Sequence, residues 1–450
     1  MDDSTTEEPR VRRQDRAHVF HSWSAQARID PMPVARAEGV RFYDYQGRGY
    51  LDFASQLVNA NLGHQHPTVV AAIREQADRL CTIAPGFAND VRGELAALVA
   101  ERGPAGMSKV FFTNGGADAV ENAIRMARQH TGRLKVLSAY RSYHGNTAAA
   151  ISATGDPRRW ANEPSVPGTV HFFGPYPYRS AFGVTDEREE CARALAHLEQ
   201  VIALEGPDTV AAVLLETVVG TNGVLVPPDG YLAGVREICD RYGVLLVCDE
   251  VMCGFGRVGE WFACQHWDVV PDLIPFAKGI NSGYVPLGGV LIGDAVAETF
   301  EERAFPGGLT YSGHPLACAA GVGSIRAFEE EHVLEHVSRL GEDVVRPSLE
   351  DLAGRHPSIG EVRGLGMLWA IELVRDRETR EMLVPFNASG ADAEPMARVM
   401  AACKERGVWP FTHFNRLHVA PPLVIDEADL KEGIAVIDDA LDIADEYVAG

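Results

Sequence analysis

Two ionisable residues stand where apolar runs end, and together they could carry out chemistry. Asp249 closes the run VLLVCD, and Lys278 follows the run DLIPFA about thirty residues later. In open α/β sheets, the carboxyl ends of neighbouring strands line the ligand site. A carboxylate there keeps a pyridine nitrogen protonated and a lysine can bond to an aldehyde, so the pair suits pyridoxal phosphate (PLP). Taken alone, the pair fits a capping aspartate and a surface lysine equally well.

The same region contains GFGRVG (254–259), which matches the G-x-G-x-x-G pattern of dinucleotide-binding turns. In such a turn the first glycine stands directly at the strand end, and the helix begins at the third. Here residues 249–253 separate the apolar run from Gly254, and no acidic residue closes a second strand about 20 residues further on. The sequence therefore disfavours an NAD oxidoreductase, which we keep as a rival class.

The stretch FFTNGGADAVENA could hold a phosphate group. Its apolar start leads through Asn114, Gly115, Gly116 and Ala117 into a run with helical periodicity. Small residues let backbone amides approach an anion, and a helix start favours negative charge. A strand-to-helix turn that needs glycines would give the same pattern. In AYRSYHGNT, Tyr143 could lie over a cofactor ring, although a core or surface position explains one tyrosine as well.

The composition is that of a soluble protein with a large core. Hydrophobic residues make up 46% and charged residues 23% of the 450-residue chain. The net charge of −22 argues against nucleic acid or an anionic membrane as a partner. No apolar run approaches the roughly 20 residues of a membrane span, and the charged start lacks the apolar segment of a signal peptide. The eight cysteines include no CxxC pair, so we expect buried thiols in a reducing cytoplasm.

The elements that position the chemical residues alternate along the middle of the chain. Helical segments separate several of the short apolar runs KVFFT, KVLSAY, AAVLLE, VLLVCDE, DLIPFAKG and LGGVLIG. Continuous apolar strands between helices predict an α/β fold with a mostly parallel sheet covered on both faces. Near the C-terminus, RGLGMLWAIELV and RLHVAPPLVI, flanked by amphipathic helices, predict a smaller α+β domain. RFYDYQGRGYLDF resembles a hairpin that joins this domain.

These patterns divide the chain into four parts. We predict a disordered arm over 1–16, because this segment is short, polar and charged. The segment 17–64 would join the small domain, residues 65–325 would form the large PLP-binding domain, and 326–450 the C-terminal small domain. No internal repeat or low-complexity linker interrupts this order.

Taken together and in this order, the motifs resemble those of class III aminotransferases, the PLP enzymes of fold type I. The matching stretches are TNGGADAVENAIRMAR, YHG, LLETVVGTNG, CDEVMCGFGR, PFAKGINSGYVPLGG and TYSGHPLACAAG. The resemblance extends over nearly the whole chain, from about residue 31 to 448. It implies a large domain built on a mostly parallel seven-stranded sheet, with a small α+β domain made from both chain ends. GFGR then follows the cofactor aspartate as a family element.

The resemblance implies a role for each matching position. Lys278 would carry the cofactor covalently and then move a proton between the substrate carbon and the cofactor. Asp249 would pair with the pyridinium nitrogen, with Val251 and Tyr143 on opposite faces of the ring. Thr310 would reach a phosphate in the partner subunit, which implies a homodimer with shared active sites and leaves a tetramer open. The implied cofactor contacts are Gly115, Gly116, Ala117, Tyr143, His144, Glu216, Asp249, Val251, Lys278 and Thr310.

Departures from subfamily patterns bear on the substrate. Aminotransferases for 4-aminobutyrate and ornithine carry an arginine after the YHG-type motif and a gating glutamate, where this chain has Asn146 and Thr221. The chain is more similar to the ω-amino acid and amine:pyruvate aminotransferases. In those enzymes an arginine of the C-terminal domain binds the carboxylate of the acceptor. Arg416 is the candidate for this role, and a surface arginine at a strand start is the alternative.

Three more positions are candidates for the substrate pocket. Val58, next to Leu57, stands where the amine:pyruvate subgroup usually has a tryptophan, so the pocket has room for a different head group. Trp23 could wall the pocket instead, or be a buried structural tryptophan. The segments HSWSAQ and NRLHVAPPL together most resemble taurine aminotransferases.

The sequence thus predicts a PLP-dependent ω-aminotransferase that works by a ping-pong mechanism. Taurine, β-alanine or 4-aminobutyrate would donate the amino group, and pyruvate or 2-oxoglutarate would accept it. A decarboxylase, an aminomutase or a biosynthetic amine:pyruvate aminotransferase of the same fold are the alternatives. A DNA-binding regulator on this scaffold is disfavoured, because the residues before the domain are too few and the net charge is negative.

Overall fold

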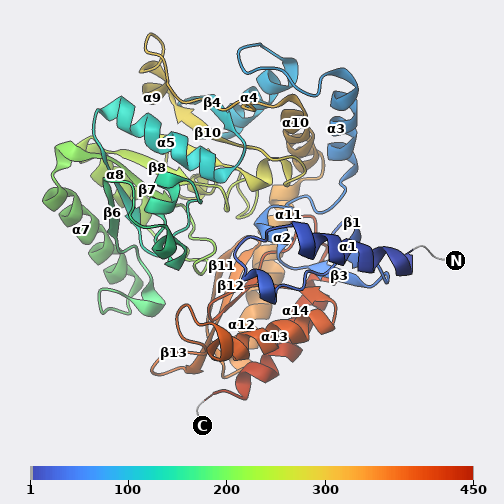
Figure 1. Ribbon diagram of the computed structural model, residues 1–450. Helices are drawn as coiled ribbons and strands as arrows, with labels where there is room; N and C mark the ends of the chain where they lie inside the picture. Colours follow the sequence, from blue (N-terminus) through green and yellow to red (C-terminus); the bar gives the residue numbers. More distant parts are fainter. Residues whose placement is uncertain (1–3, 449–450) are drawn as a thin grey trace.

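The computed structural model describes residues 4–448. A seven-stranded sheet forms the centre of its larger part, shown in the upper half of Figure 1. Strands β9, β8, β7, β5 and β6 run parallel, whereas β10 is antiparallel to both β4 and β9. The predicted mostly parallel seven-stranded sheet is therefore confirmed. In spatial order the strands are β4 (Met107–Thr113), β10 (Gly288–Gly293), β9 (Leu273–Phe276), β8 (Leu245–Asp249), β7 (Val210–Glu216), β5 (Lys135–Ala139) and β6 (Thr169–Phe172).

Helices cover both faces of this sheet, which explains why its strands are continuously apolar. Successive residues of β7 point to opposite faces: Val213 packs with helices α7 and α8, and Leu214 packs with α5 and α6. Helix α5 ends at Thr131, because Gly132 follows in the left-handed conformation with φ of 70°, which favours glycine. The four helices are α5 (Gly116–Thr131), α6 (Ala148–Ala153), α7 (Glu187–Glu205) and α8 (Tyr231–Tyr242).

Four further helices complete the larger part. Helices α4 and α10 share a core with strands β4, β9 and β10, and α3 packs along α10. The short helix α9 follows β10 directly. Their bounds are α3 (Pro67–Arg79), α4 (Asp90–Arg102), α9 (Asp294–Glu298) and α10 (Pro315–Glu330).

Strands from both ends of the chain form the smaller part. The predicted hairpin is present as β2 and β3, and β14 from the C-terminal region pairs in parallel with β3. A second sheet has the order β11-β12-β16-β15, with β13 beside β12. The strands are β1 (Val34–Glu38), β2 (Arg41–Asp44), β3 (Gly49–Asp52), β11 (Ile359–Leu365), β12 (Leu368–Asp376), β13 (Glu381–Met382), β14 (Val408–Trp409), β15 (Phe411–His413) and β16 (Arg416–Val419).

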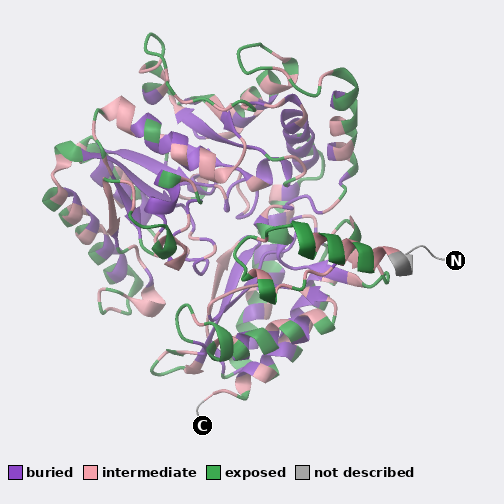
Figure 2. Cartoon of the chain, viewed as in Figure 1, coloured by how far each residue is buried: buried purple, intermediate pink, exposed green. Residues whose placement is uncertain are grey.

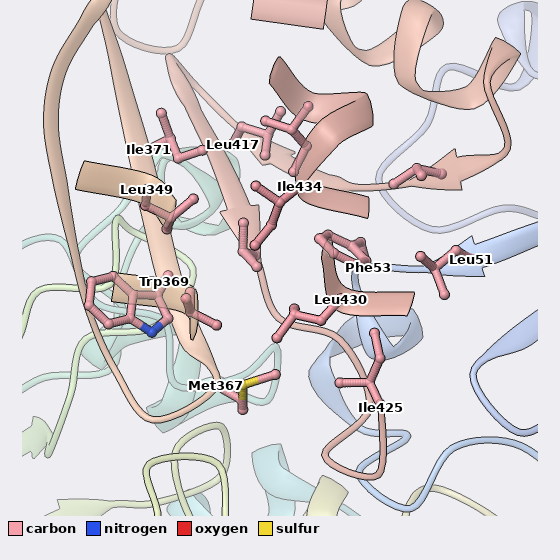
Figure 3. Packing of buried hydrophobic residues seen from close by; sticks show 14 of the residues in the cluster. Leu51, Phe53, Leu349, Met367, Trp369, Ile371, Leu417, Ile425, Leu430 and Ile434 are labelled. Atoms are coloured by element: carbon pink, nitrogen blue, oxygen red, sulfur yellow. The ribbon is translucent and has the colours of Figure 1, made fainter. Parts of the chain in front are cut away.

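Helices close this smaller part around its own hydrophobic core. Figure 3 shows Phe53 beside Leu430 and Ile434 of α14, so residues far apart in sequence meet in one core. Figure 2 shows exposed residues on the outward faces of α13 and α14, while the strands beneath them are buried. The exact domain boundaries stay predictions. The helices are α11 (Val333–Leu340), α12 (Arg346–Arg355), α13 (Glu394–Glu405) and α14 (Glu427–Asp445).

The prediction of a disordered arm over 1–16 is wrong for the described residues of this segment, which belong to helix α1 (Ser4–His18). Its charges are paired at helical spacing, because Arg10 and Arg12 lie 3.2 and 3.3 Å from Glu7 and Glu8. Arg12 also pairs with Asp30 at 2.7 Å, which ties the helix to the chain that follows. Figure 1 shows α1 against the smaller part. None of the described helices combines the length and the apolar character of a membrane crossing.

The GFGRVG segment joins the two parts of the molecule. Arg257 is fully buried, and its guanidinium donates to the carbonyl oxygens of Met367 and Pro421 at 3.2 and 2.6 Å. It also donates to Asn61 Oδ1 at 2.8 Å. Burial lowers the pKa of Arg257 to about 9. Gly256 and Gly259 have positive φ, so glycines are needed for the turn around this structural arginine. This requirement accounts for the misleading resemblance of GFGRVG to a dinucleotide-binding turn.

Candidate active site

A cavity of about 170 Å³ at the carboxyl ends of the parallel strands collects most of the predicted cofactor residues. This cavity is called here the cofactor cavity. Gly115, the residue that precedes α5, and Thr310 do not line it. The lining also includes three residues not predicted as cofactor contacts: Gly145, Thr221 and Met252. The predicted residues that line it are Gly116, Ala117, Tyr143, His144, Glu216, Asp249, Val251 and Lys278.

Asp249 and Lys278 both line this cavity, as their places at two strand ends predict. Asp249 is the last residue of β8, and Lys278 begins the turn η6 (Lys278–Asn281) just after β9. Lys278 has φ of 49°, a conformation that costs backbone energy and is typical of functional sites. Burial lowers the pKa of Lys278, which makes the neutral amine more accessible.

Asp249 is held in one orientation by two hydrogen bonds. His144 Nδ1 lies 2.7 Å from Asp249 Oδ2, and the Val251 N–H donates to Oδ1 at 3.0 Å. Because an ionised carboxylate only accepts, the proton of this histidine belongs on Nδ1. His144 Nε2 is buried and has no hydrogen-bond partner among the described residues. The pair therefore fixes a buried carboxylate whose charge can stabilise a cation in the cavity.

Glu216 is the neighbour of Asp249 across the sheet, since the two residues are paired in register at the ends of β7 and β8. Its two carboxylate oxygens accept from the backbone N–H groups of Tyr143 and Gly220, both at 2.8 Å. Burial raises the pKa of Glu216. The glutamate thus fixes the loop that carries the Tyr143 ring, and a direct contact between Glu216 and the cofactor stays a prediction.

The start of α5 forms the end of the cavity predicted to bind phosphate. Gly116 is the first helical residue, and a Cβ at this position would lie only 2.7 Å from Val251 Cγ1. Glycine is therefore required for Val251 to pack here. The first N–H groups of a helix lack partners within the helix, and the helix dipole attracts an anion.

The residues fit PLP at each end of the cavity. The buried Asp249–His144 pair suits a protonated pyridine nitrogen, the α5 start suits a phosphate, and Lys278, just after the end of β9, has a lowered pKa. Tyr143 and Val251 line the same cavity, as packing on a planar ring requires. Thr310 is exposed in the single chain, so its predicted contact with a partner's phosphate stays a prediction.

A second cavity, of about 370 Å³, opens from the first and is called here the substrate cavity. The two cavities share Tyr143, Thr221, Met252 and Lys278. Three of the four residues predicted to bind substrate, Trp23, Leu57 and Val58, line it. Trp23 is 70% exposed in the single chain, so the fold of one chain does not bury it as a structural tryptophan. The remaining lining residues are Arg158, Phe411 and His413.

A strained loop presents Leu57 and Val58 to the substrate cavity. Ser55, Gln56 and Val58 all have positive φ, which is unfavourable for side chains with a Cβ and most of all for a β-branched one. Asp52 stabilises the loop, because its carboxylate accepts from the backbone and the side chain of Gln56 at 3.0 and 2.8 Å. Strain of this kind persists only where surrounding contacts enforce it.

Arg158 is the charged residue of the substrate cavity that the sequence did not reveal. It belongs to the short turn η2 (Pro157–Asn162), and its guanidinium carbon lies 3.7 Å from the centre of the Tyr143 ring. The buried carboxylate of Asp156 accepts from Arg158 Nε at 2.9 Å and also contacts Nη2. Arg158 Nη1 donates no hydrogen bond within the described chain. The arginine is thus fixed beside Tyr143 with a free donor.

Arg416, the predicted carboxylate-binding arginine, lines neither cavity. Its side chain is fully buried, so the alternative of a surface arginine is wrong. Arg416 Nε lies 3.4 Å from Glu372, while Nη1 and Nη2 are buried without partners among the described residues. It is paired in register with His413, which does line the substrate cavity. A contact between Arg416 and substrate therefore requires its side chain to turn, and stays a prediction.

The class III aminotransferase family model matches residues 23–441, so the chain belongs to this family. The fold and the cavity thus define a PLP-dependent aminotransferase of class III. The protein is similar to the taurine–pyruvate aminotransferase of Bilophila wadsworthia, with 35% identity over 449 residues and 95% of each chain covered. It is also 35% identical to the putrescine–pyruvate aminotransferase of Pseudomonas aeruginosa, covering 91% of this chain and 90% of the relative.

Solved structures include a similar protein over almost the full length. The taurine:2-oxoglutarate aminotransferase of Bifidobacterium kashiwanohense, in complex with PLP and glutamate, superposes with a TM-score of 0.94 at 42% identity. The match covers 98% of this chain and 99% of that one. The predicted fold type and cofactor are therefore confirmed, whereas identities of 35–42% leave the substrate of this ω-amino acid aminotransferase open.

Proposed function

We propose that this aminotransferase takes the amino group of a short ω-amino acid with an anionic head, taurine foremost, and transfers it to a 2-oxo acid. The observation that carries the proposal is the position of Arg158 in the same cavity as Lys278. A donor whose amine reaches the lysine would find a guanidinium for its sulfonate or carboxylate. Guanidinium groups bind such anions through charge-assisted hydrogen bonds.

The residues around Lys278 divide the reaction into tasks. PLP, when bound, supplies an electron sink for the carbon that carries the amino group. Lys278 accepts the proton that leaves this carbon and would then donate it to the cofactor, so it acts as a positioned general base and acid. Asp249 supplies a carboxylate for the ring nitrogen, and His144 keeps Asp249 in place. Tyr143 lines both cavities and packs against the Arg158 guanidinium, so it connects the cofactor side with the anionic head of the donor.

The names of two relatives support this donor class. Taurine is named as the substrate of the relative from Bilophila wadsworthia and of the structural neighbour from Bifidobacterium kashiwanohense. Another relative, from Bacillus subtilis, is described as a probable 4-aminobutyrate aminotransferase at 35% identity. β-Alanine and 4-aminobutyrate therefore stay in the proposed class. The acceptor is pyruvate or 2-oxoglutarate, and Arg416 is the proposed contact for its carboxylate once the side chain has turned.

We also infer that the working form is a homodimer. Trp23 and Leu57 line the substrate cavity but are 70% and 54% exposed in the single chain, so a second chain would cover its mouth. Thr310 is exposed, as a residue that reaches the partner's phosphate must be. Light scattering on the holoenzyme is expected to give twice or four times the mass of one chain. A monomer at working concentration would contradict this inference.

The donor is tested in the half-reaction with no acceptor present. PLP-loaded enzyme is mixed with taurine, β-alanine, 4-aminobutyrate or L-alanine, and the visible absorbance of the bound cofactor is followed. We expect rapid loss of absorbance with taurine or β-alanine. A response to L-alanine alone would contradict the donor class. A response to none of them would favour the decarboxylase or aminomutase alternatives or an unusual biosynthetic amine.

Arg158→Gln is expected to lower kcat/KM for the anionic donor by about 10- to 150-fold. A hydrogen bond to a charged group contributes about 1.5–3 kcal/mol, and this range corresponds to that factor. For an uncharged amine such as propylamine, kcat/KM should change little. The measurement is the half-reaction rate with both donors.

Arg159→Gln is the matched control, because Arg159 lies in the same turn, pairs with Glu163 at 3.3 Å and lines neither cavity. It should leave both donors unchanged. An equal loss for taurine and propylamine in Arg158→Gln would mean that Arg158 supports Tyr143 and does not bind the anionic head.

A further inference from the structure

A third cavity, of about 200 Å³, lies at the carboxyl ends of β5, β6 and β7, and is called here the lateral cavity. It is separate from the substrate cavity, with which it shares no lining residue. Glu216 lines both the lateral cavity and the cofactor cavity. Four aromatic residues form part of its wall: Tyr140, Phe173, Tyr176 and Tyr231. The space equals that of about seven liquid water molecules, enough for a small organic compound.

Two arginines in this wall have donors left over. Arg141 makes no side-chain hydrogen bond or ion pair within the described chain, although it is largely enclosed and lies 5.0 Å from the Tyr176 ring. Arg179 donates through Nε to Glu372 and through Nη1 to the Arg380 carbonyl at 2.6 Å. Its Nη2 is buried without a partner. Unpaired guanidinium donors in an enclosed space are unfavourable unless an anion accepts from them.

The nearby carboxylates do not neutralise this charge. Glu372 is shared by three arginines, because it pairs with Arg179, with Arg363 at 2.7 Å and with Arg416 at 3.4 Å. Both oxygens of Glu216 accept from backbone N–H groups, and Glu216 forms no ion pair with Arg141 or Arg179. Burial lowers the pKa of Arg141, which is the effect expected of a cation without a counter-charge. The lateral cavity therefore has an excess of positive charge.

The cavity also has an apolar entrance. Tyr140 and Phe173 are 39% and 46% exposed, and their ring centres lie 5.1 Å apart. Exposed aromatic side chains beside a cavity provide a surface for an apolar ligand body. Positive charge inside an aromatic wall selects an anion with an apolar part over inorganic phosphate or a hydrophilic dicarboxylate.

We propose that the lateral cavity binds a small organic anion, a carboxylate or sulfonate on an aromatic or branched apolar body, with its charge on Arg141 and Arg179. The site is distinct from the place of the amino donor and does not depend on which donor is used. A ligand there touches Glu216, whose carboxylate holds the backbone of Tyr143 in the cofactor cavity. Occupancy should therefore also shift the absorbance of the bound cofactor.

The test uses the holoenzyme with benzoate as the anionic probe and benzamide as its uncharged analogue. Ligand-observed NMR and cofactor absorbance are measured during titration. We expect benzoate to bind and benzamide not to bind. Arg141→Gln and Phe173→Ala should each weaken benzoate binding by about tenfold or more, with the donor half-reaction preserved.

Two controls locate the bound anion. Arg193→Gln changes an exposed arginine that pairs with Glu189 on α7 and should leave benzoate binding unchanged. Arg158→Gln should also leave it unchanged, because Arg158 lines the substrate cavity. Binding that is lost in Arg158→Gln and kept in Arg141→Gln would place benzoate in the active site and overturn the proposal. Equal binding of benzamide, or no binding of benzoate to the wild type, would overturn it as well.

Discussion

Lys278→Ala is expected to abolish turnover while the protein still binds PLP. Among the residues that line the cofactor cavity, Lys278 is the only lysine, so no neighbouring amine can replace it. General acid–base catalysis alone contributes about 10²–10⁴-fold, and loss of the covalent attachment adds to this. The α5 start and the Asp249–His144 pair remain in the variant, so we expect non-covalent binding to persist. Single-turnover rates with taurine measure the loss.

The position of covalent attachment gives a readout that does not depend on activity. Borohydride reduction followed by mass spectrometry should fix PLP to the peptide that contains Lys278 in the wild type and to no peptide in Lys278→Ala. Lys135→Ala is the matched control. Lys135 lies at the start of β5, pairs with Glu205 at 2.7 Å and lines neither the cofactor cavity nor the substrate cavity. Turnover retained in Lys278→Ala, or PLP fixed to another lysine, would contradict the assignment.

The sequence predicted which residues meet in the cofactor cavity because strand ends are a local property. Apolar runs such as VLLVCD identify buried strands, and parallel strands bring their carboxyl ends to one edge of the sheet. Asp249 and Glu216 therefore meet in register although 33 positions separate them. The glycines before α5 are predictable in the same way, since a helix start and close packing both require them.

The substrate side was less predictable because its residues depend on contacts between distant segments. Arg158 stands in a short turn, and only its packing on Tyr143 and its hold by Asp156 bring it to the cavity. A strand start next to Arg416 was recognisable, but the direction of the Arg416 side chain depends on Glu372 in another strand. No periodicity in the sequence encodes either arrangement.

The terminal helix α1 was missed for a similar reason. Its residues are strongly polar, which is typical of disordered segments. Ion pairs at helical spacing and the contact between Arg12 and Asp30 stabilise it in place of a buried apolar face. Composition alone does not distinguish these two cases, because both have many charges and few apolar residues.

Asp249→Asn is expected to slow the half-reaction by at least about 10²–10³-fold, the usual effect of removing a preorganised electrostatic stabiliser. The amide has nearly the shape of the carboxylate but no negative charge to oppose a protonated pyridine nitrogen. Asp249 is buried, and no other carboxylate beside Glu216 lines the cavity to replace it. Glu216 itself is held by two backbone N–H groups.

The protonation of the cofactor separates this role from a structural one. In holoenzyme loaded with PLP labelled with ¹⁵N in the ring, the nitrogen resonance should indicate a protonated ring in the wild type and an unprotonated ring in Asp249→Asn. Asp272→Asn is the control, because Asp272 lies at the opposite end of the sheet, where it accepts from the Leu246 N–H at 2.7 Å. A ring that stays protonated in Asp249→Asn, with rates near those of the wild type, would show that the cation is stabilised elsewhere.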